Sequence, residues 1–426
     1  MKQELQVSAG AVKIVSALKE SGFESYIVGG AVRDLLLGRE PKDFDISTSA
    51  TPEEIREVFG RRKARIIGKR FRLAHVFMDG EIYEVSTFRS APRENAGNPS
   101  DYTEKSHHVY GAKPENLILS DNSFGNAKED AFRRDFTVNA LFYDPLAQEV
   151  LDLTGMGMAD IASKTVRAIG IPALRFEEDP VRMLRALKLV AQFDFTLDNA
   201  TENALFSSLE LLRHAATSRL TLELEKILKS SCSDRHFEVF HDYGLMQYFL
   251  PHLSRQWGSA EVQQMLALLY ERNCRVDEKL YRNSVSLALA AAALPFVNRA
   301  LGVEVNGIFT LPGRETREII GNVVDEVFAP LNLMVRVREA ACRILYMQPA
   351  LETLDRSRRG ELMQQRAYAH ARELFMVRHA AAGEVLAPLM EVWPQGYDHA
   401  GKTEFFPRRK DNGKGKEGKK FRRKKI

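Results

Sequence analysis

Residues 26–46, YIVGGAVRDLLLGREPKDFDI, constrain the fold more than any other stretch of the chain. Residues 26–28 form a short apolar run typical of a buried strand. Gly29 and Gly30 follow directly, where backbone without side chains can approach a phosphate group. Residues 31–37 predict a short helix whose positive N-terminal end faces the glycines. The stretch therefore predicts a strand, an anion-binding turn and a helix in immediate succession.

A second strand is expected to follow and to carry Asp43 and Asp45. Because strand side chains alternate between faces, the two carboxylates would share one face while Phe44 and Ile46 enter the core. Two carboxylates held together favour a cation between them, and a site built from oxygen ligands favours Mg²⁺. With Arg33 in the first turn of the helix, the stretch combines an anion site with a metal site, which suits nucleotidyl transfer by two metal ions.

Each motif alone is weak, since a glycine pair is usually a turn and an Asp-x-Asp pair is usually on the surface. Their order and spacing are more specific: G-G-x-V-R-D-x-L-L-G followed by D-F-D resembles the head of the class II nucleotidyltransferases of the polymerase-β-like superfamily. That family contains bacterial poly(A) polymerases and tRNA CCA-adding enzymes. The similarity continues through RRDFTVNA at 133–140 and EDPVRMLRA at 178–186.

The resemblance implies an α+β fold class, with a nucleotidyltransferase head that holds a small mixed sheet and flanking helices. An all-α neck and body and a disordered basic tail would follow. The expected domains are a catalytic head at 1–155, a neck with a base-recognition helix at 156–235, an RNA-binding body at 236–400 and the tail at 401–426.

The resemblance also implies site residues. The catalytic carboxylates would be Asp43, Asp45 and Asp135. The metal ligands would be Asp43, Asp45 and Glu84, which lies on a strand expected beside the one that carries the aspartates. Whether Glu84 or Asp135 supplies the third carboxylate of the metal site stays open. The set expected to bind the nucleotide comprises Gly29, Gly30, Arg33, Arg134, Asp179, Arg182 and Arg185.

A helix predicted to begin near Glu178 would carry Asp179, Arg182 and Arg185 on one face, because they recur at every third residue. Aspartate offers acceptors and arginine offers a fork of donors, so such a face can recognise the edge of a base without a template. Lys188, one turn further on, retains a cation where the family commonly has arginine. The alternative is an ordinary salt bridge on a solvated helix.

The composition is that of a soluble globular protein, with 44% hydrophobic residues and no apolar run long enough to span a bilayer. The first residues lack the apolar core of a signal peptide. The three cysteines, Cys232, Cys274 and Cys342, are scattered and odd in number, which argues against a disulfide framework. A cytoplasmic protein without a membrane partner is expected.

Charge is concentrated at the C-terminus. Residues 408–426 contain 11 Lys and Arg against two acidic residues, a local net charge of +9, whereas the whole chain carries +4. Such a tail binds polyanions without reading their sequence. The alternatives are a solubilising end and an anchor to a membrane surface.

These patterns together predict a bacterial poly(A) polymerase that transfers AMP from ATP to RNA 3′ ends, of mRNA and other transcripts, and releases pyrophosphate. Two Mg²⁺ ions are the expected cofactors, with Mn²⁺ as an alternative. The stretch IIGKRFRLAHV at 66–76 resembles the poly(A) polymerase version of this strand pair more than the CCA-adding one, and a basic C-terminal extension is a common trait of poly(A) polymerases. The alternative is a tRNA CCA-adding or A-adding nucleotidyltransferase. A non-catalytic RNA-binding protein on a decayed head would have lost Asp43, Asp45 or Arg33, and all three are retained.

Overall fold

The computed structural model describes residues 2–68, 72–90, 124–310, 313–354 and 356–395. The chain divides into two compact units, Met1–Ser259 with Asp325–Leu333, and Ala260–Val324 with Met334–Ile426. The predicted basic tail and residues 69–71 of the basic stretch lie outside the described residues. Among the described helices, none combines the length and apolar composition that a membrane span requires.

The first unit contains a seven-stranded mixed sheet, as expected for the head. Its strands are β1 (Ser25–Val28), β2 (Asp45–Thr48), β3 (Ala64–Ile67), β4 (Leu73–Met78), β5 (Glu81–Thr87), β6 (Leu141–Asp144) and β7 (Glu149–Asp152). They lie in the order β3-β4-β5-β2-β1-β6-β7. Only β2 and β5 run parallel to each other, and the remaining neighbours are antiparallel. β1 and β2 are therefore the central strands.

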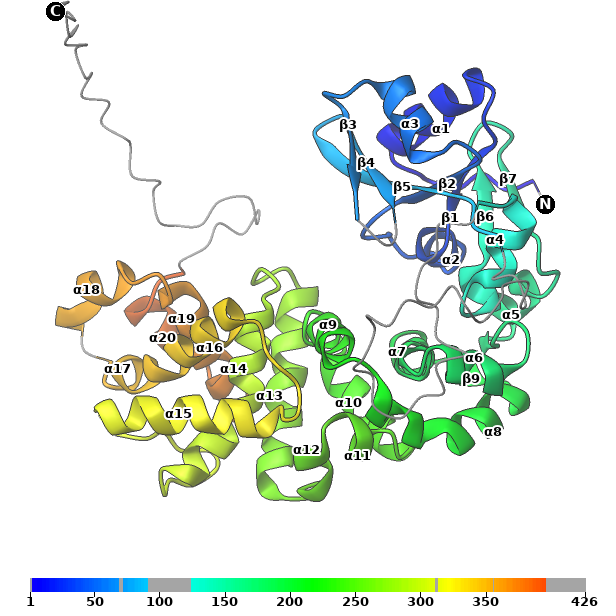
Figure 1. Ribbon diagram of the computed structural model, residues 1–426. Helices are drawn as coiled ribbons and strands as arrows, with labels where there is room; N and C mark the ends of the chain where they lie inside the picture. The colour runs from blue at the N-terminus through cyan, green and yellow to red at the C-terminus, as the bar shows by residue number, and fades with distance from the viewer. Residues whose placement is uncertain (1, 69–71, 91–123, 311–312, 355, 396–426) are drawn as a thin grey trace, which may run out of the picture. The chain divides into compact units, whose positions relative to one another are not determined.

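The helices of the head are α1 (Ala9–Glu20), α2 (Gly30–Leu36), α3 (Pro52–Phe59), α4 (Ala127–Arg133) and α5 (Gly157–Ala162), with a 3₁₀ helix η3 (Thr137–Asn139). Ser8 caps α1 by accepting a hydrogen bond from the backbone N–H of Ala11. Thr51 and Glu54 form a capping box at the start of α3. Helices α1 and α3 lie together on one side of the sheet (Figure 1).

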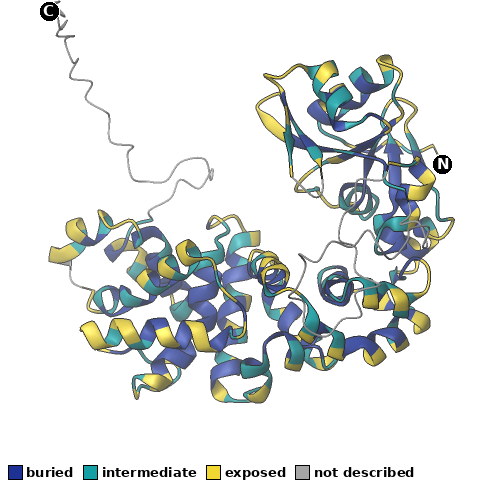
Figure 2. Ribbon diagram, in the orientation of Figure 1, coloured by how far each residue is buried: buried dark blue, intermediate teal, exposed yellow. Residues whose placement is uncertain are grey.

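The core beneath the functional edge of the sheet is aromatic. Tyr26 stacks on Phe88 with ring centroids 6.3 Å apart and meets Phe142 edge to face at 5.9 Å. Phe88 and Phe142 are fully buried, and Val28 at the end of β1 packs in the same cluster. Figure 2 shows this buried interior of the sheet. The cluster fixes the end of β1, and therefore the position of the glycine turn that follows.

The structure corrects two details of the Asp-x-Asp strand. β2 begins at Asp45, so Asp43 lies in irregular chain before the strand. Ile46 is buried as expected, but Phe44 is only half-buried. The prediction that alternation along one strand places both carboxylates on one face is wrong, because alternation holds only inside a strand.

The rest of the first unit is mainly helical. It consists of α6 (Pro172–Glu178), α7 (Val181–Phe193), α8 (Asn199–Ser208), the 3₁₀ helix η4 (Leu209–His214), α9 (Thr217–Leu228), α10 (Ser233–Asp242), α11 (Met246–Phe249) and α12 (Pro251–Arg255). Two short parallel strands, β8 (Thr165–Val166) and β9 (Thr196–Leu197), pair beside these helices. Sequence analysis did not anticipate that pairing.

The predicted start of the base-recognition helix near Glu178 is wrong. Glu178 is the last residue of α6, and α7 begins at Val181 after the N-cap residue Pro180. Asp179 has an extended backbone and lies between the two helices. Asp179 therefore does not share a helical face with Arg182 and Arg185.

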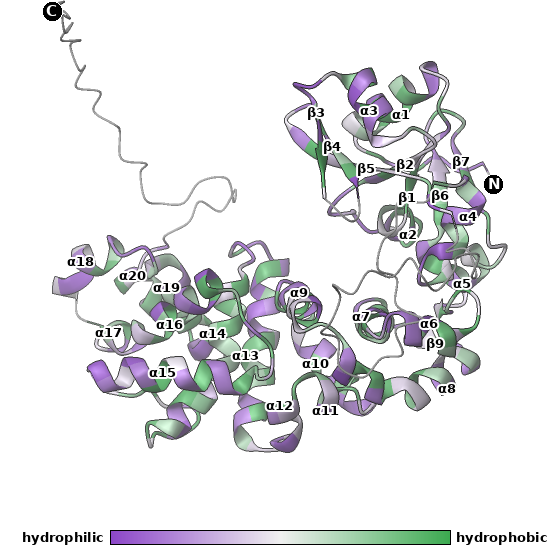
Figure 3. Cartoon of the chain, in the orientation of Figure 1, coloured by the Kyte–Doolittle hydropathy of each residue, from purple (hydrophilic) through white to green (hydrophobic). Residues whose placement is uncertain are grey.

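The second unit is all-helical in its described residues. It consists of α13 (Ala260–Asp277), α14 (Val285–Ala300), part of α15 (Arg314–Val327), α16 (Val335–Tyr346), α17 (Gln348–Glu352), the 3₁₀ helix η5 (Arg356–Arg358), α18 (Arg359–Met363), α19 (Tyr368–Ala381) and α20 (Ala387–Val392). Residues 287–298 of α14 are buried throughout. Figure 3 shows hydrophilic and hydrophobic residues on the same helix in α15, as expected for a helix that covers a core.

Candidate active site

A cleft of about 800 Å³ opens in the first unit where β1 ends and β2 begins. Its lining contains ten of the eleven residues that sequence analysis assigned to the site, namely Gly29, Gly30, Arg33, Asp45, Glu84, Arg134, Asp135, Asp179, Arg182 and Arg185. Asp43 is described but does not line the cleft. Residues as far apart in the sequence as Gly29 and Arg185 are thus brought to one place.

The glycine turn connects β1 to α2 in a conformation that favours glycine. Gly29 has a φ of 74°, in the left-handed region, and caps α2. A Cβ atom on Gly29 would lie 3.1 Å from Nη1 of Arg134, which is tighter than an ordinary contact. Both the backbone conformation and the neighbouring guanidinium therefore require bare backbone at this edge of the cleft.

The sheet register places the carboxylates beside this turn. Asp45 lies opposite Val28, the residue before Gly29, in the β1–β2 ladder. The parallel β2–β5 ladder pairs Ile46 with Val85. Asp45 and Glu84, each one residue earlier, are therefore neighbours on adjacent strands. Glu84 therefore lies on the strand beside Asp45, as expected.

The electrostatics of Asp45 are unusual for a carboxylate that retains solvent contact. Enclosure by surrounding protein atoms raises its pKa to about 6, and the negative charges of Glu84 and Asp43 act in the same direction. Arg134 opposes them by stabilising the ionised form. The charges of Glu84 and Asp43 thus both disfavour the ionised form of Asp45, although Asp43 acts from outside the strand.

Such crowding fits a divalent cation, because a cation would relieve the mutual repulsion of oxygen ligands. Asp45 and Glu84 could hold it from the sheet, with Asp43 beside them. In the described part of the chain, no three His, Cys, Asp or Glu side chains are arranged closely enough to form a ready-made metal cage. A site with few protein ligands suits Mg²⁺, which commonly keeps water and substrate phosphate oxygens as ligands.

Asn139 connects three of the predicted site residues, and sequence analysis did not single it out. Its Oδ1 accepts a hydrogen bond from Nη1 of Arg33 at 2.6 Å, and its Nδ2 donates to Oδ1 of Asp135 at 3.1 Å. Its backbone carbonyl accepts from Nη1 of Arg134 at 3.4 Å. The guanidinium of Arg33 also binds Asp34 and lies over the ring of Phe193, 4.5 Å from its centroid.

Arg134 is held in place by both the sheet and α4. Its Nη2 donates to Oδ2 of Asp130 at 2.9 Å and to the hydroxyl of Ser47 at 3.2 Å. Its guanidinium lies over the ring of Phe142. These contacts direct the positive charge towards the glycine turn and Asp45.

The junction of α6 and α7 is built from paired arginines. Arg182 is buried, and its Nη1 donates to Oε2 of Glu178 at 2.8 Å and to the carbonyl of Arg175 at 2.9 Å. Arg175 in turn donates to the carbonyls of Arg133 and Arg134 at 2.6 and 2.8 Å. Arg182 is therefore tied, through Arg175, to the turn that carries Arg134 and Asp135.

Helix α9 supplies ion-pair partners to which sequence analysis assigned no role. Nη2 of Arg219 donates to Oδ2 of Asp179 at 2.7 Å, while Oδ1 of Asp179 accepts from the N–H of Val181 at the start of α7. Glu223, almost fully buried, binds Lys188 at 2.7 Å and lies 3.7 Å from Arg185. The ion pairs thus attach α9 to the recognition helix.

The coupling of Glu223 and Lys188 has opposite consequences for the two groups. Burial by itself would raise the pKa of Glu223, but Lys188 and Lys226 outweigh it and hold the pKa at about 2. Burial lowers the pKa of Lys188, and the attraction of Glu223 only partly offsets this. The ion pair thus stabilises the ionised form of Glu223, whereas desolvation disfavours the charged form of Lys188.

Three family models match the chain: "Poly A polymerase head domain" over residues 25–167, "Probable RNA and SrmB- binding site of polymerase A" over 194–256, and "Polymerase A arginine-rich C-terminus" over 315–426. The first match contains the glycine turn, both aspartates and Asp135.

Relatives of two kinds are similar to the chain. Poly(A) polymerase I of Salmonella typhi is 33% identical over 87% of this chain and 78% of its own length. The CCA-adding enzyme of Bacillus pumilus is 32% identical over 65% of this chain and 70% of its own length. Among solved structures, the Bacillus stearothermophilus CCA-adding enzyme in complex with CTP superposes with a TM-score of 0.60 at 27% identity, covering 90% of this chain and 80% of its own.

Proposed function

Because the chain belongs to the family of poly(A) polymerases and CCA-adding enzymes, which are RNA nucleotidyltransferases, we propose that it adds AMP from ATP to RNA 3′ ends and releases pyrophosphate. The observation that carries this proposal is the position of Asp45, which lies opposite Val28 just before the glycine turn and beside Glu84 on the neighbouring strand. A crowded carboxylate cluster and an anion-accepting backbone within one cleft are what nucleotidyl transfer needs.

Most of the predicted site residues are proposed to bind either the triphosphate or divalent cations. Gly29, Gly30 and Arg33 receive the triphosphate, and Arg134 lies beside them to balance its charge. Asp45, Glu84 and Asp43 hold divalent cations, for which Mg²⁺ is our assignment. When bound, these ions would lower the pKa of the attacking RNA 3′-hydroxyl and stabilise the charge on the leaving pyrophosphate.

Base selection is proposed to rest on Asp179, Arg182 and Arg185. Nη1 of Arg182 is occupied by Glu178 and a backbone carbonyl, whereas its other N–H groups make no hydrogen bond within the described residues. They can donate to ring atoms of adenine, and the free lone pairs of Asp179 can accept from its amino group. Asp135, held by Asn139, is proposed to orient the incoming nucleotide near the carboxylates.

Adenylate addition is favoured over CCA addition because the poly(A) polymerase relative matches 87% of this chain and the CCA-adding relative 65%. The basic residues 408–426 are a further argument, since they suit RNA of any sequence. We propose that residues 1–155 carry catalysis and residues 156–235 carry base recognition. Residues 236–400 would bind RNA, and residues 401–426 would attract RNA without sequence preference.

Incorporation of labelled ATP and of labelled CTP, measured separately on an unstructured RNA and on a tRNA that lacks its 3′ end, tests this proposal. Long A tracts on the unstructured RNA are expected, with little incorporation of CTP. Addition that ends after a few nucleotides and requires tRNA would instead establish the CCA- or A-adding activity.

Replacing Glu223 with Gln should destabilise the first unit, because the substitution leaves Lys188 buried without its counter-ion. We expect the free energy of unfolding, measured by urea denaturation near neutral pH, to fall by about 3 kcal/mol. Since the folded pKa of Glu223 lies below its ordinary value, its contribution is present above about pH 4 and is lost as the pH falls towards about 2.

The difference between wild type and Glu223→Gln should therefore shrink on acidification. Glu210→Gln is a matched control, because Glu210 is exposed and its partner Arg213 lies at 3.8 Å. A Glu223→Gln variant as stable as Glu210→Gln near neutral pH would show that the buried pair contributes nothing to the fold.

A further inference from the structure

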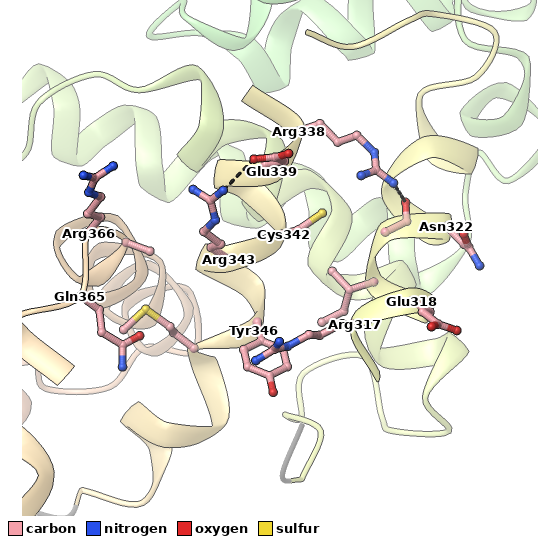
Figure 4. A pocket seen from close by; sticks show the side chains of 14 residues that line it. Arg317, Glu318, Asn322, Arg338, Glu339, Cys342, Arg343, Tyr346, Gln365 and Arg366 are labelled. Carbon is pink, nitrogen blue, oxygen red and sulfur yellow. Dashed lines mark hydrogen bonds and ion pairs between the residues drawn. The ribbon is translucent and has the colours of Figure 1, made fainter. Parts of the chain in front are cut away.

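The second unit contains a cleft of about 1120 Å³ whose rim is rich in arginine (Figure 4). Residues of α15 and α16 and the chain between α18 and α19 line it. Among the described residues that line it are four arginines and two glutamates, and no lysine. Arginine presents a planar fork of donors that matches the geometry of a phosphate, so this composition suits a phosphate-bearing ligand.

Two of these arginines keep their charge available. Arg317 and Arg366 are exposed, and within the described residues neither has a carboxylate partner. Arg343 is paired with Glu339 on its own helix at 2.6 Å, but both side chains are exposed. An exposed pair of this kind is weak, so a phosphate can compete for Arg343 at small cost.

An aromatic surface lies among these charges. The guanidinium of Arg317 is 4.2 Å from the ring centroid of Tyr346, and Figure 4 shows the two side chains together at one side of the cleft. A tyrosine ring with an arginine beside it stacks on a nucleobase through its π face and through cation–π attraction.

The floor of the cleft contains buried apolar side chains. Ile320 is fully buried, and Met347 is 5% exposed. Helices α15 and α16 are held together at Gly321, whose carbonyl accepts a hydrogen bond from Nη2 of Arg338 at 3.1 Å. A Cβ atom on Gly321 would lie 3.0 Å from that nitrogen, so the guanidinium of Arg338 would have to shift slightly to admit a larger residue.

We propose that this cleft binds single-stranded RNA, with phosphates at Arg317, Arg343 and Arg366 and one base against Tyr346. A charged rim, a stacking ring and an apolar floor together match a nucleotide unit rather than an acidic peptide, which offers no flat base. The choice of RNA rests on the proposed function, since an enzyme that extends RNA 3′ ends must also hold the RNA upstream of the end. This cleft lies in a different compact unit from the candidate active site.

The test uses the full-length protein and a fluorescent unstructured RNA of about 20 nucleotides, with binding followed by anisotropy over a series of salt concentrations. The double variant Arg317→Gln/Arg366→Gln should bind roughly tenfold more weakly, and the slope of log K against log salt should fall by about 1.4 for two lost phosphate contacts. Arg336→Gln is the matched control, because Arg336 is exposed on α16 but does not line the cleft.

A second variant separates stacking from charge. Tyr346→Leu should weaken RNA binding by at least about fivefold while the salt slope stays at the wild-type value. In incorporation assays, the double variant should raise the KM for RNA and leave the KM for ATP and the rate at saturating RNA unchanged.

RNA affinity and salt slope equal to those of Arg336→Gln would overturn the proposal. The proposal would also be overturned if the double variant bound free ATP more weakly but RNA with wild-type affinity. That result would assign the cleft to a mononucleotide. A wild-type protein that incorporates no nucleotide would refute the proposed function. The RNA-binding role of the cleft could still be tested, because the anisotropy measurement needs no catalysis.

Discussion

Replacing Asp45 with Asn should reduce nucleotide incorporation by at least about a thousandfold, while RNA binding measured by anisotropy stays at the wild-type level. Asp45 is the carboxylate that the sheet places both beside the glycine turn and beside Glu84. Asn keeps the shape of the side chain but removes the charge that would hold a cation. Incorporation within tenfold of wild type would refute the role of Asp45.

Asp45→Asn should also be more stable than the wild type when a chelator removes divalent metal. The folded pKa of Asp45, about 6, lies above its ordinary value, so its ionisation costs stability as the pH rises from about 4 to about 6. Above that range the full cost applies, which we put at about 1 kcal/mol because the side chain keeps solvent contact. Asp45→Asn should therefore exceed wild type in melting temperature at about pH 8 and match it at about pH 4.

Metal addition provides a readout that does not depend on activity. Mg²⁺ should raise the melting temperature of the wild type at about pH 8 and have little effect on Asp45→Asn. Asp79→Asn is the matched control, since Asp79 is an exposed carboxylate of the same head that pairs with Lys13 at 2.9 Å. Equal stabilisation of all three proteins by Mg²⁺ would place the cation elsewhere.

Replacing Arg182 with Lys should lower kcat/KM for ATP by about a hundredfold and reduce the preference for ATP over CTP. Lysine retains the positive charge and can still pair with Glu178. A single ammonium cannot at the same time bind Glu178, the carbonyl of Arg175 and the edge of a base, as a guanidinium can.

Nucleotide competition distinguishes base recognition from a structural role. Arg213→Lys is the control, because Arg213 is exposed in the same unit, pairs only loosely with Glu210 and does not line the cleft. If Arg182→Lys lowered incorporation of ATP and CTP by the same factor, Arg182 would only support the α6–α7 junction.

The fold and most of the site could be predicted from the sequence because their signals are local. The strand, the glycine pair and the following helix lie within adjacent residues, and Gly29 has the positive φ that such a turn needs. The caps at Ser8 and at Thr51 with Glu54 depend on contacts three residues apart. The family resemblance, which the comparisons confirm, extended these local signals to Arg134 and Asp135.

Local patterns did not reveal where two of the acidic residues lie. Asp43 was expected on the strand with Asp45, but β2 starts only at Asp45. Asp179 was expected on the recognition helix, but α6 ends at Glu178 and α7 begins after Pro180. Periodicity alone does not locate the end of an element, so spacing alone placed both residues incorrectly.

The sequence alone thus indicates the glycine turn, the strand before it and the identity of the charged groups, since each follows from the chemistry of neighbouring residues. The partners of those groups come from far away: Asn139 meets Arg33 across 106 positions, and Arg219 meets Asp179 across 40. Periodicity in the sequence does not predict contacts between residues so far apart along the chain. Only the packing of α9 against α7, and of η3 against α2, brings Asn139, Arg219 and Glu223 to their partners.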